Sequence, residues 1–394
     1  MKKYDYIIAG GGLAGLSLAF HINASPTLRT KKILLVDKDT KTQNDRTWCF
    51  WTNKSTAFDE IVFHEWEKAH FYGVDYSKHA ELSPFKYKMI RGIDFYNYTK
   101  KILRQNPNIE WLTDNIDDIQ DNRDGAEIRI GDTTYQANWI FNSTFDIKQF
   151  QKKSNRYFYQ LQHFKGWIIE TQEDTFNTDE MHLMDFRTAQ HNNARFFYVL
   201  PFSKQKALIE YTIFSDTLLE QEEYDVVLKE YIRDTLHIEN YQIEETEYGI
   251  IPMTNHPFKK MKGKHILNIG TIGGDAKSST GYAFNSVQDV VKSITENLEN
   301  QQHPCPNISI FDKRFIIYDT LILNILQHEG GLIKPIFTKL FKNNKIQTVF
   351  TFLNEGTSFW EELKIFINLP HMPFWRSIFS VYFYKPIKNL FVKG

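Results

Sequence analysis

Residues 4–15 of this chain read YDYIIAGGGLAG, and this stretch decides the fold. A short apolar run ends at three glycines with the GxGxxG spacing, Gly10, Gly12 and Gly15, and a helix-like sequence follows. In such a unit the first glycine permits a tight turn, the second lets the backbone approach a pyrophosphate, and the third lets the helix pack close to the strand. The stretch therefore predicts a strand, a glycine turn and a helix whose N-terminus faces phosphate groups.

A second apolar strand is expected at residues 32–36, and it ends at Asp37, 22 residues after Gly15. A carboxylate at this distance accepts hydrogen bonds from a ribose in dinucleotide-binding units. A glycine turn alone often serves packing only, but a purely structural turn leaves this acid unexplained. We therefore predict a dinucleotide site, and its place at the start of the chain favours FAD over NAD.

The composition argues against several classes of protein. A formal net charge of -1 over 394 residues argues against general nucleic-acid binding. The two cysteines lack CxxC spacing, which argues against a disulfide framework or cysteine metal site and fits a reducing cytoplasm. The 13 histidines lack HxxxH or HExxH spacing, so we expect no metal. We find neither a signal-peptide pattern nor an apolar run long enough to cross a membrane.

The order of strand and helix patterns predicts an α/β fold with a doubly wound, Rossmann-like FAD-binding domain. We expect this domain to be discontinuous, at residues 1–150 and 255–300, because a second strand, glycine cluster and helix pattern lies in the later segment. Period-two patterns predict a substrate-binding domain with an antiparallel sheet at residues 151–254. Residues 301–394 are expected to form a helical C-terminal cap.

The end of the chain combines basic and aromatic residues. Residues 331–394 carry a formal charge of +6, ten phenylalanines and two tryptophans. This composition is typical of a helical region that lies on an anionic membrane surface. A helical domain with an aromatic core and solvated lysines fits it equally well.

Two carboxylates interrupt strongly apolar strand patterns, Asp185 in LMDFR and Glu210 in ALIEYT. A buried carboxyl group is costly unless it is paired or functional, and desolvation keeps its proton bound to higher pH. Both residues are therefore candidates for a general acid. In the structural alternative, Asp185 pairs with Arg187 or Arg195, and Glu210 lies on the solvent face of an edge strand. The acidic run at residues 244–247 is expected to be solvated.

The order of many motifs resembles that of the bacterial FAD-dependent lycopene β-cyclases. Besides the glycine motif these are RTWCFW, YKMIRGIDFY, GWIIET, MDFR, FYVLPFS, ALIEYT, YGIIPM, TGYAF and LNEGTSFWEELKIFINLP, which span nearly the whole chain. The resemblance implies a flavoprotein-hydroxylase-like fold and an isomerisation without net redox change. An acid protonates the terminal double bond of a ψ end of lycopene, an internal double bond attacks the cation, and proton loss leaves a β-ionone ring. The implied cofactors are reduced FAD and, as electron source, NAD(P)H.

The resemblance also implies roles for single residues. Glu210 and Asp185 match activity-linked carboxylates of the family, whereas Tyr211 stands where many relatives carry a second acid. The implied cofactor-binding residues are Gly10, Gly12, Gly15, Asp37, Arg91, Thr280, Gly281 and Tyr282. Asp275 matches an aspartate that holds the ribityl chain in related hydroxylases, although lycopene cyclases often lack it.

Two other functions stay open on the sequence alone. One is a flavin monooxygenase or reductase of the same fold that acts on a long apolar isoprenoid and consumes NAD(P)H stoichiometrically. The other is a carotenoid-carrying or membrane-associated binding protein, which would have no use for two buried acids. The expected location is the cytoplasm, peripheral on the inner face of the cell membrane, with lycopene as the substrate.

Overall fold

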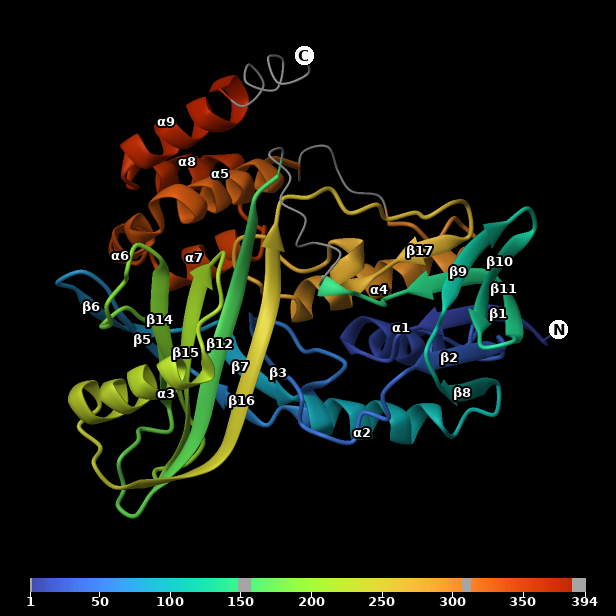
Figure 1. The fold of residues 1–394 in the computed structure, drawn as a ribbon, viewed down its shortest axis with the longest axis horizontal. Coiled ribbons are helices and arrows are strands. Elements are labelled where there is room, and N and C mark those ends of the chain that lie inside the picture. Colours follow the sequence, from blue (N-terminus) through green and yellow to red (C-terminus); the bar gives the residue numbers. More distant parts are fainter. Residues whose placement is uncertain (1, 148–156, 307–312, 385–394) are drawn as a thin grey trace.

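Strand β1 (Lys2–Ala9) forms the centre of a seven-stranded sheet in the computed structural model, which describes residues 2–147, 157–306 and 313–384 (Figure 1). Parallel pairing joins β1 to β2 and to β11, and β11 to β17, so the chain returns to this sheet late, as the sequence predicts. The other strands of the sheet are β8 (Ile109–Thr113), β2 (Ile33–Asp37), β11 (Thr133–Asn142), β10 (Gly125–Ile130), β9 (Asp118–Asn122) and β17 (Ile266–Asn268).

Both faces of β1 and β2 are buried, which explains why their sequences are continuously apolar. Tyr6 and Ile8 pack against one apolar cluster, which includes the helices α1 (Leu13–Ala24), α2 (Gly92–Leu103) and α4 (Phe284–Glu299). Ile7 and Leu34 point to the opposite face, where they meet Ile128 of the β9–β10 hairpin.

A second seven-stranded sheet is formed mainly by residues 159–254. Its spatial order is β16 (Tyr241–Thr254), β12 (Tyr159–Thr171), β15 (Lys206–Ser215), β14 (Ala194–Pro201), β13 (Glu180–Asp185), β5 (Lys68–Tyr72) and β6 (Ser77–Glu81). All pairs are antiparallel except β13 with β5. Strands β5 and β6 lie within the segment expected to belong to the first domain, but they pair with β13. The other domain boundaries stay a prediction.

The two faces of the second sheet are covered differently. The outer face packs against α3 (Gln221–Glu230) and the π-helical turn Tyr231–Thr235, through an apolar cluster that includes Phe197 and Tyr211. The inner face shares a larger cluster with the cap helices and with a small sheet of β3 (Thr47–Thr52), β7 (Lys86–Arg91) and β4 (His64–Trp66). Side chains at even positions of β14 and β15, such as Tyr198 and Leu208, point to this inner face.

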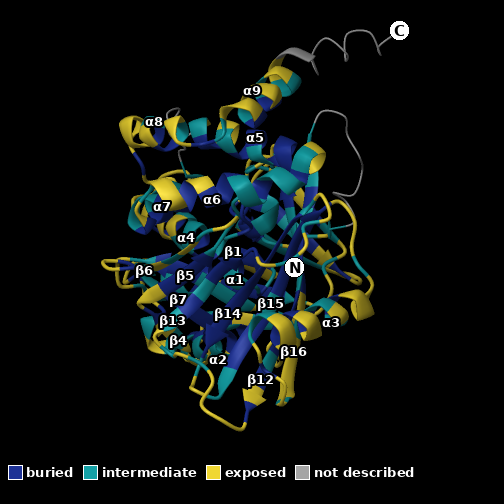
Figure 2. Ribbon diagram, turned by 90° about the vertical axis from the view of Figure 1, so that its left-hand side faces the viewer, coloured by how far each residue is buried: buried dark blue, intermediate teal, exposed yellow. Residues whose placement is uncertain are grey.

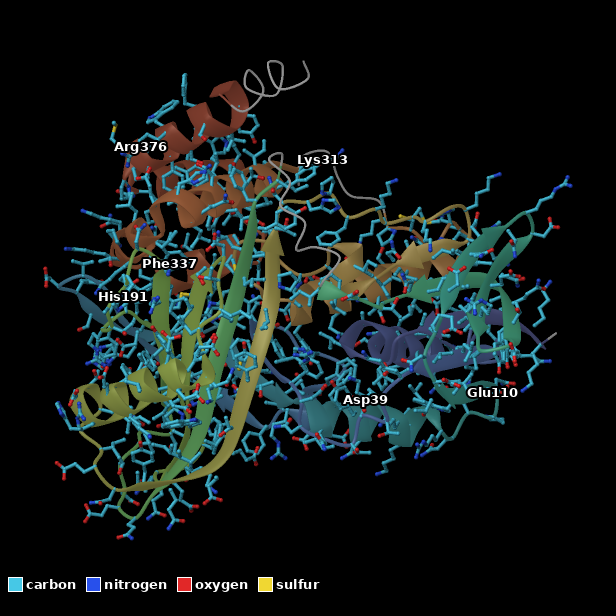
Figure 3. The ribbon with its side chains drawn as sticks, viewed as in Figure 1. Asp39, Glu110, His191, Lys313, Phe337 and Arg376 are labelled. Carbon is cyan, nitrogen blue, oxygen red and sulfur yellow. The ribbon has the colours of Figure 1, made fainter. Side chains whose placement is uncertain are left out.

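The helical cap consists of α5 (Lys313–Glu329), α6 (Ile333–Asn343), α7 (Ile346–Leu353), α8 (Phe359–Ile367) and α9 (His371–Phe379). Figure 3 shows Phe337 of α6 beside the second sheet and Arg376 of α9 on the outer side of the cap. A reciprocal capping box between Ser358 and Glu361 starts α8. Among the described residues, we find no helix long and apolar enough to cross a membrane. The α/β class, the antiparallel sheet and the helical cap predicted from the sequence are confirmed.

Candidate active site

Three glycines shape the turn between β1 and α1, each in the way that the GxGxxG spacing predicts. Gly10 has a φ of 103°, and a Cβ atom there would lie 2.3 Å from Ser143 Oγ. A Cβ at Gly15 would lie 1.9 Å from the carbonyl oxygen of Gly10, whereas one at Gly12 would have no atom within 4 Å. Gly12 is the N-cap of α1 and provides no side-chain cap. The helix N-terminus therefore opens onto space that fits a phosphate group.

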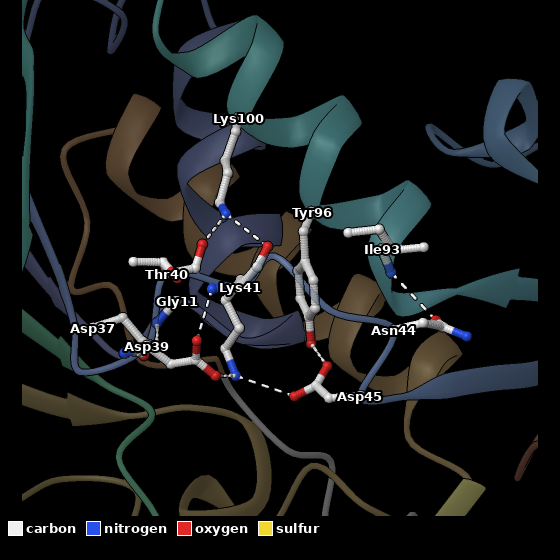
Figure 4. Close-up of polar contacts among 10 residues, drawn as sticks. All are labelled: Gly11, Asp37, Asp39, Thr40, Lys41, Asn44, Asp45, Ile93, Tyr96 and Lys100. Carbon is white, nitrogen blue, oxygen red and sulfur yellow. Dashed lines mark hydrogen bonds and ion pairs between the residues drawn. The ribbon is translucent and has the colours of Figure 1, made fainter. Parts of the chain in front are cut away.

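Asp37, at the end of β2, braces this turn with its carboxylate. Its Oδ2 accepts a hydrogen bond from the backbone N–H of Gly11 at 2.5 Å, and its Oδ1 accepts one from Asp39 at 2.7 Å (Figure 4). The loop that follows is fixed by Asp45, which accepts a hydrogen bond from Tyr96 Oη at 2.9 Å and pairs with Lys41. Each oxygen of the Asp37 carboxylate has two lone pairs, so Asp37 can still accept a hydrogen bond from a ribose hydroxyl.

The segment 280–282 lies just before α4, which begins at Phe284. Gly281 has a φ of 73°, and a Cβ atom there would lie 2.1 Å from Gln162 Oε1. Thr280 Oγ1 and Gln162 Oε1 are both buried without a hydrogen-bond partner in the described part of the chain. Such atoms are rare in native proteins unless a bound group or water satisfies them. The segment therefore fits a site that a polar cofactor completes.

Two further cofactor candidates form hydrogen bonds and ion pairs within the protein. Arg91 donates to both carboxylate oxygens of Asp94, at 2.6 and 3.0 Å, and its guanidinium lies 4.1 Å from the ring centroid of Phe63. Asp275 is buried, pairs with Lys260 and accepts a hydrogen bond from the backbone N–H of Gly270 at 2.6 Å. A cofactor role for Arg91 or Asp275 stays a prediction.

Glu210 and Glu247 flank Gly166 on the inner face of the second sheet. In the register of the strands, Gly166 of β12 lies opposite Glu210 of β15 on one side and opposite Glu247 of β16 on the other. A Cβ atom at Gly166 would lie 3.1 Å from Cγ and Oε1 of Glu247 and 2.9 Å from Leu208 Cδ1. Neighbouring strands are about 4.8 Å apart. Because Gly166 has no side chain, Glu210 and Glu247 can approach each other across the strand that lies between them.

The two carboxyl groups have few partners that favour their charged forms. Glu210 Oε1 accepts a hydrogen bond from Thr212 Oγ1, and Glu247 Oε2 accepts one from Thr47 Oγ1, each at 2.7 Å. No cation pairs with either carboxylate among the described residues. Burial raises the pKa of Glu210 well above its ordinary value, and the neighbouring Glu247 raises it further. Burial also raises the pKa of Glu247. The pair therefore holds a proton at a pH where isolated carboxyl groups have lost theirs.

Aromatic side chains lie on the same face of the sheet as the carboxyl pair. Tyr198 lies directly opposite Glu210 in the β14–β15 register. Its hydroxyl lies 3.1 Å from that of Tyr282, which lies 3.2 Å from that of Tyr87. The Trp51 ring meets Tyr282 edge-on, with 4.6 Å between centroids. Tyr282, predicted to lie near the flavin, thus connects the segment 280–282 to the carboxyl side of the sheet.

Asp185 lies on the other face of the same sheet. Its carboxylate is fully buried, pairs with Arg187 at 2.6 Å and accepts a hydrogen bond from Tyr231 Oη at 2.6 Å. Tyr231 belongs to the outer apolar cluster, so the structure does not bring Asp185 to Glu210. This is the arrangement of the structural alternative for Asp185, and a catalytic role for it stays a prediction.

The expectation that residues 244–247 are all solvated is wrong for Glu247. Glu244 and Glu245 are exposed, but Glu247 is half-buried and its Oε1 is shielded from solvent. A usable signal was present, because Glu247, Gly249, Ile251 and Met253 alternate with other residues along β16 and so share one face. The places of Tyr198, Tyr87 and Gly166 in the site could not be predicted from the sequence, because they depend on strand pairing.

A family of known proteins matches nearly the whole chain. The family described as "Lycopene cyclase protein" matches residues 5–378, which include both glutamates and the glycine turn. The chain belongs to the lycopene cyclase family.

Individual relatives are distant. A chloroplastic neoxanthin synthase of Solanum tuberosum is 24% identical over 308 residues, covering 71% of this lycopene cyclase family member and 57% of the synthase. The chain thus spans little more than half the length of that relative.

Solved structures share the fold. A geranylgeranyl bacteriochlorophyll reductase-like protein from Thermoplasma acidophilum has a TM-score of 0.56 at 12% identity, with 97% of each chain covered. The flavin-dependent brominase Bmp2 has a TM-score of 0.59 at 12% identity, over 91% of this chain and 94% of that one. These likenesses show that the family member has the fold of flavin-dependent enzymes.

Alanine substitutions at Gly15 and Gly12 should affect different properties, the stability of the fold and the binding of flavin. Gly15→Ala places Cβ against a backbone oxygen and should destabilise the fold by about 1–3 kcal/mol or more. Gly12→Ala meets open space, so it should keep the melting temperature of the flavin-free protein and lose bound flavin. Thermal denaturation and the flavin absorbance of purified protein measure the two effects. Equal flavin content in Gly12→Ala and the wild type would contradict the cofactor position.

The raised pKa of Glu210 predicts a pH-dependent stability. An unfolded glutamate loses its proton near pH 4.3, whereas the folded protein keeps it, so the free energy of unfolding falls as pH rises from that value to the folded-state pKa. The Glu210→Gln variant has no carboxyl group at this position and does not lose stability in this way. Its free energy of unfolding, relative to that of the wild type, should therefore increase as pH rises, by about 1.4 kcal/mol for each unit of the pKa shift. Urea denaturation across pH measures it. The exposed Glu222→Gln is the control, and parallel curves for Glu210→Gln and the wild type would contradict the shift.

Proposed function

We propose that this protein is a lycopene β-cyclase, which converts the ψ ends of lycopene into β-ionone rings and yields β-carotene through γ-carotene. The observation that carries the proposal is the Glu210–Glu247 pair, two carboxyl groups that hold a proton beside aromatic rings in a member of the lycopene cyclase family. Protonation of an alkene requires an acid that is still protonated near neutral pH and is shielded from water.

The proposed proton path begins and ends at the carboxyl pair. Glu210 donates its proton to the terminal double bond of the ψ end, where a C–H bond forms and leaves a carbocation. The internal double bond supplies the electron pair of the new ring bond. A ring C–H bond then breaks, and its proton returns to the carboxylate, so the product is an isomer of the substrate. Thr212 and Thr47 orient the two carboxyl groups through their hydrogen bonds.

Aromatic rings next to the pair support a cationic intermediate. Tyr198, Tyr282 and Trp51 lie on the same side of the sheet as Glu210. A desolvated cation over an aromatic face is stabilised by about 2 kcal/mol. Arg187 and Arg195 lie toward the outer face, with Asp185 and Tyr211 respectively, so neither opposes a positive charge at the pair.

The proposed cofactor is reduced FAD, with NAD(P)H as its source of electrons. The residues proposed to hold it are those of the glycine turn, Asp37 and the segment 280–282, where two buried polar atoms lack partners. When bound, the reduced flavin supplies electrostatic stabilisation and acid–base chemistry with no net electron transfer to the product. Tyr282 would connect the flavin to the carboxyl pair, because its hydroxyl lies within hydrogen-bond distance of Tyr198.

The protein surface that we propose to contact a membrane consists of exposed apolar side chains on α8 and α9. Trp360 and Trp375 are 72% and 64% exposed, and they are joined by Phe359, Ile367, Met372 and Phe379. Figure 2 shows α8 and α9 at the outer end of the cap, largely exposed. Large apolar side chains gathered in this way mark a membrane or protein contact, and a long apolar substrate resides in a membrane. The wider segment 331–394 extends beyond the described residues.

The test is an anaerobic assay of purified protein with lycopene in liposomes, with its FAD reduced beforehand. We expect γ- and β-carotene without net flavin oxidation and, in D₂O, one solvent deuteron in each ring formed. Glu210→Gln and Glu247→Gln should lower ring formation by about 10²–10⁴-fold with FAD still bound. Glu245→Gln on the same strand is exposed and is the matched control.

Gly166→Ala tests the approach of the two acids. The added Cβ meets the ends of flexible side chains, so the fold should persist while Glu247 is displaced and ring formation falls. Near-normal cyclisation by both Glu210→Gln and Glu247→Gln would contradict the acid–base assignment. Stoichiometric NAD(P)H consumption with uncyclised lycopene would instead favour the monooxygenase or reductase.

Membrane attachment is tested by liposome flotation. Trp360→Ser with Trp375→Ser should lower partitioning by more than about a hundredfold, because burial of a large apolar side chain contributes about 1.5–3 kcal/mol. Val226→Ser is the control, since Val226 is 55% exposed but lies on α3, away from the cap. Unchanged partitioning of the double variant would contradict the proposed surface.

A further inference from the structure

Histidines from three neighbouring strands meet at the far edge of the second sheet. His70 of β5 lies opposite His79 of the edge strand β6, and also opposite His182 of β13. The ring centroids of His70 and His79 are 3.6 Å apart, and His79 Nδ1 lies 2.7 Å from Glu180 Oε1. Potential ligand atoms of His70, His79 and Glu180 all lie within 4.8 Å of one another. Two imidazoles and a carboxylate thus converge.

His70 has a free nitrogen within this cluster. Its side chain is 7% exposed, and its Nδ1 lies 2.8 Å from the hydroxyl of Tyr72. Its Nε2 is buried and has no hydrogen-bond partner among the described residues. Metal-binding histidines commonly have one ring nitrogen fixed by a neighbour while the other faces the metal. The Tyr72 hydroxyl leaves His70 in that state.

Charges around the cluster are compatible with a cation. The guanidinium of Arg187 lies 3.5 Å from the ring centroid of Tyr72 and is paired with Asp185.

We infer that His70, His79 and Glu180 bind a zinc ion. Two histidine nitrogens and a carboxylate oxygen are a common ligand set for Zn²⁺, with a fourth tetrahedral position open to water. The carboxylate contributes one negative charge, so the bound ion keeps part of its charge beside solvent. His182 forms a wall of the site, with its ring centroid 5.8 Å from that of His70.

The site is separate from the carboxyl pair. Ala69 and Phe71 of β5 belong to the inner cluster, so His70 and Tyr72, which alternate with them, point to the outer face. An ion there would link β6, β5 and β13. We expect it to brace the exposed edge of the sheet, and this inference does not depend on the proposed function.

Zinc titration of the untagged full-length protein, stripped with a chelator, tests the inference. A chromophoric zinc chelator serves as the competitor. We expect one tight ion per chain, a higher melting temperature with zinc, and a tetrahedral spectrum with Co²⁺. His79→Ala and Glu180→Gln should weaken binding by about tenfold or more and abolish the thermal shift. His371→Ala changes an exposed histidine on α9 and should bind like the wild type.

Tyr72→Phe separates positioning from ligation. It keeps the ring under Arg187 but removes the hydroxyl that fixes His70, so zinc affinity should fall by about 10–100-fold. Equal metal-free melting temperatures of the variants and the wild type would show that the fold is intact. The inference is overturned if the wild type takes up no stoichiometric zinc, or if His79→Ala and Glu180→Gln bind it as tightly as His371→Ala.

Discussion

The approach of Glu210 and Glu247 across Gly166 is the constraint on which the rest of the site depends. Two carboxyl groups without a cation can stay close only if they hold a proton, and burial makes that requirement stronger. The absence of a side chain at Gly166 provides the space. A shift of register by one residue in either neighbouring strand would turn a glutamate to the other face. The register of β15, β12 and β16 is thus a condition for the proposed chemistry.

The same sheet resolves the cost of a buried carboxylate in two ways. On the outer face, Asp185 pairs with Arg187 and accepts a hydrogen bond from the Tyr231 hydroxyl. On the inner face, Glu210 accepts a hydrogen bond from Thr212 but has another acid as its neighbour and no cation among the described residues, so a bound proton lowers the cost of its burial. Only the second arrangement, two carboxyl groups without a cation, fits the acid that the proposed chemistry requires.

The cap is joined to the proposed flavin side of the site as well as to the sheet. Lys277 Nζ lies 3.0 Å from Asp319 of α5 and 2.7 Å from Glu355, and Ser279 donates a hydrogen bond to Asp319 at 2.7 Å. Trp51 stacks on Phe350 of α7. The segment that carries Tyr282 is therefore anchored to the helices whose outer members expose the apolar surface. A proposed membrane contact and a proposed proton site thus belong to one packed unit.

By itself, the sequence determined the glycine turn, the α/β class, the antiparallel sheet, the helical cap and Glu210 as an unusual acid, because each depends on residues close together in the chain. Only the tertiary structure decided that Glu247 is the partner of Glu210. Glu244 and Glu245, which precede Glu247 in the sequence, are exposed, so the local sequence predicts an exposed side chain there as well. The tertiary structure also decided that Asp185 lies on the face of the sheet opposite to Glu210, and that β5 and β6 belong to the second sheet. The cluster of His70, His79 and Glu180 could not be predicted from the sequence either, because strand pairing brings these residues together. Strand register joins residues that are far apart in sequence, and a local pattern carries no information about that register.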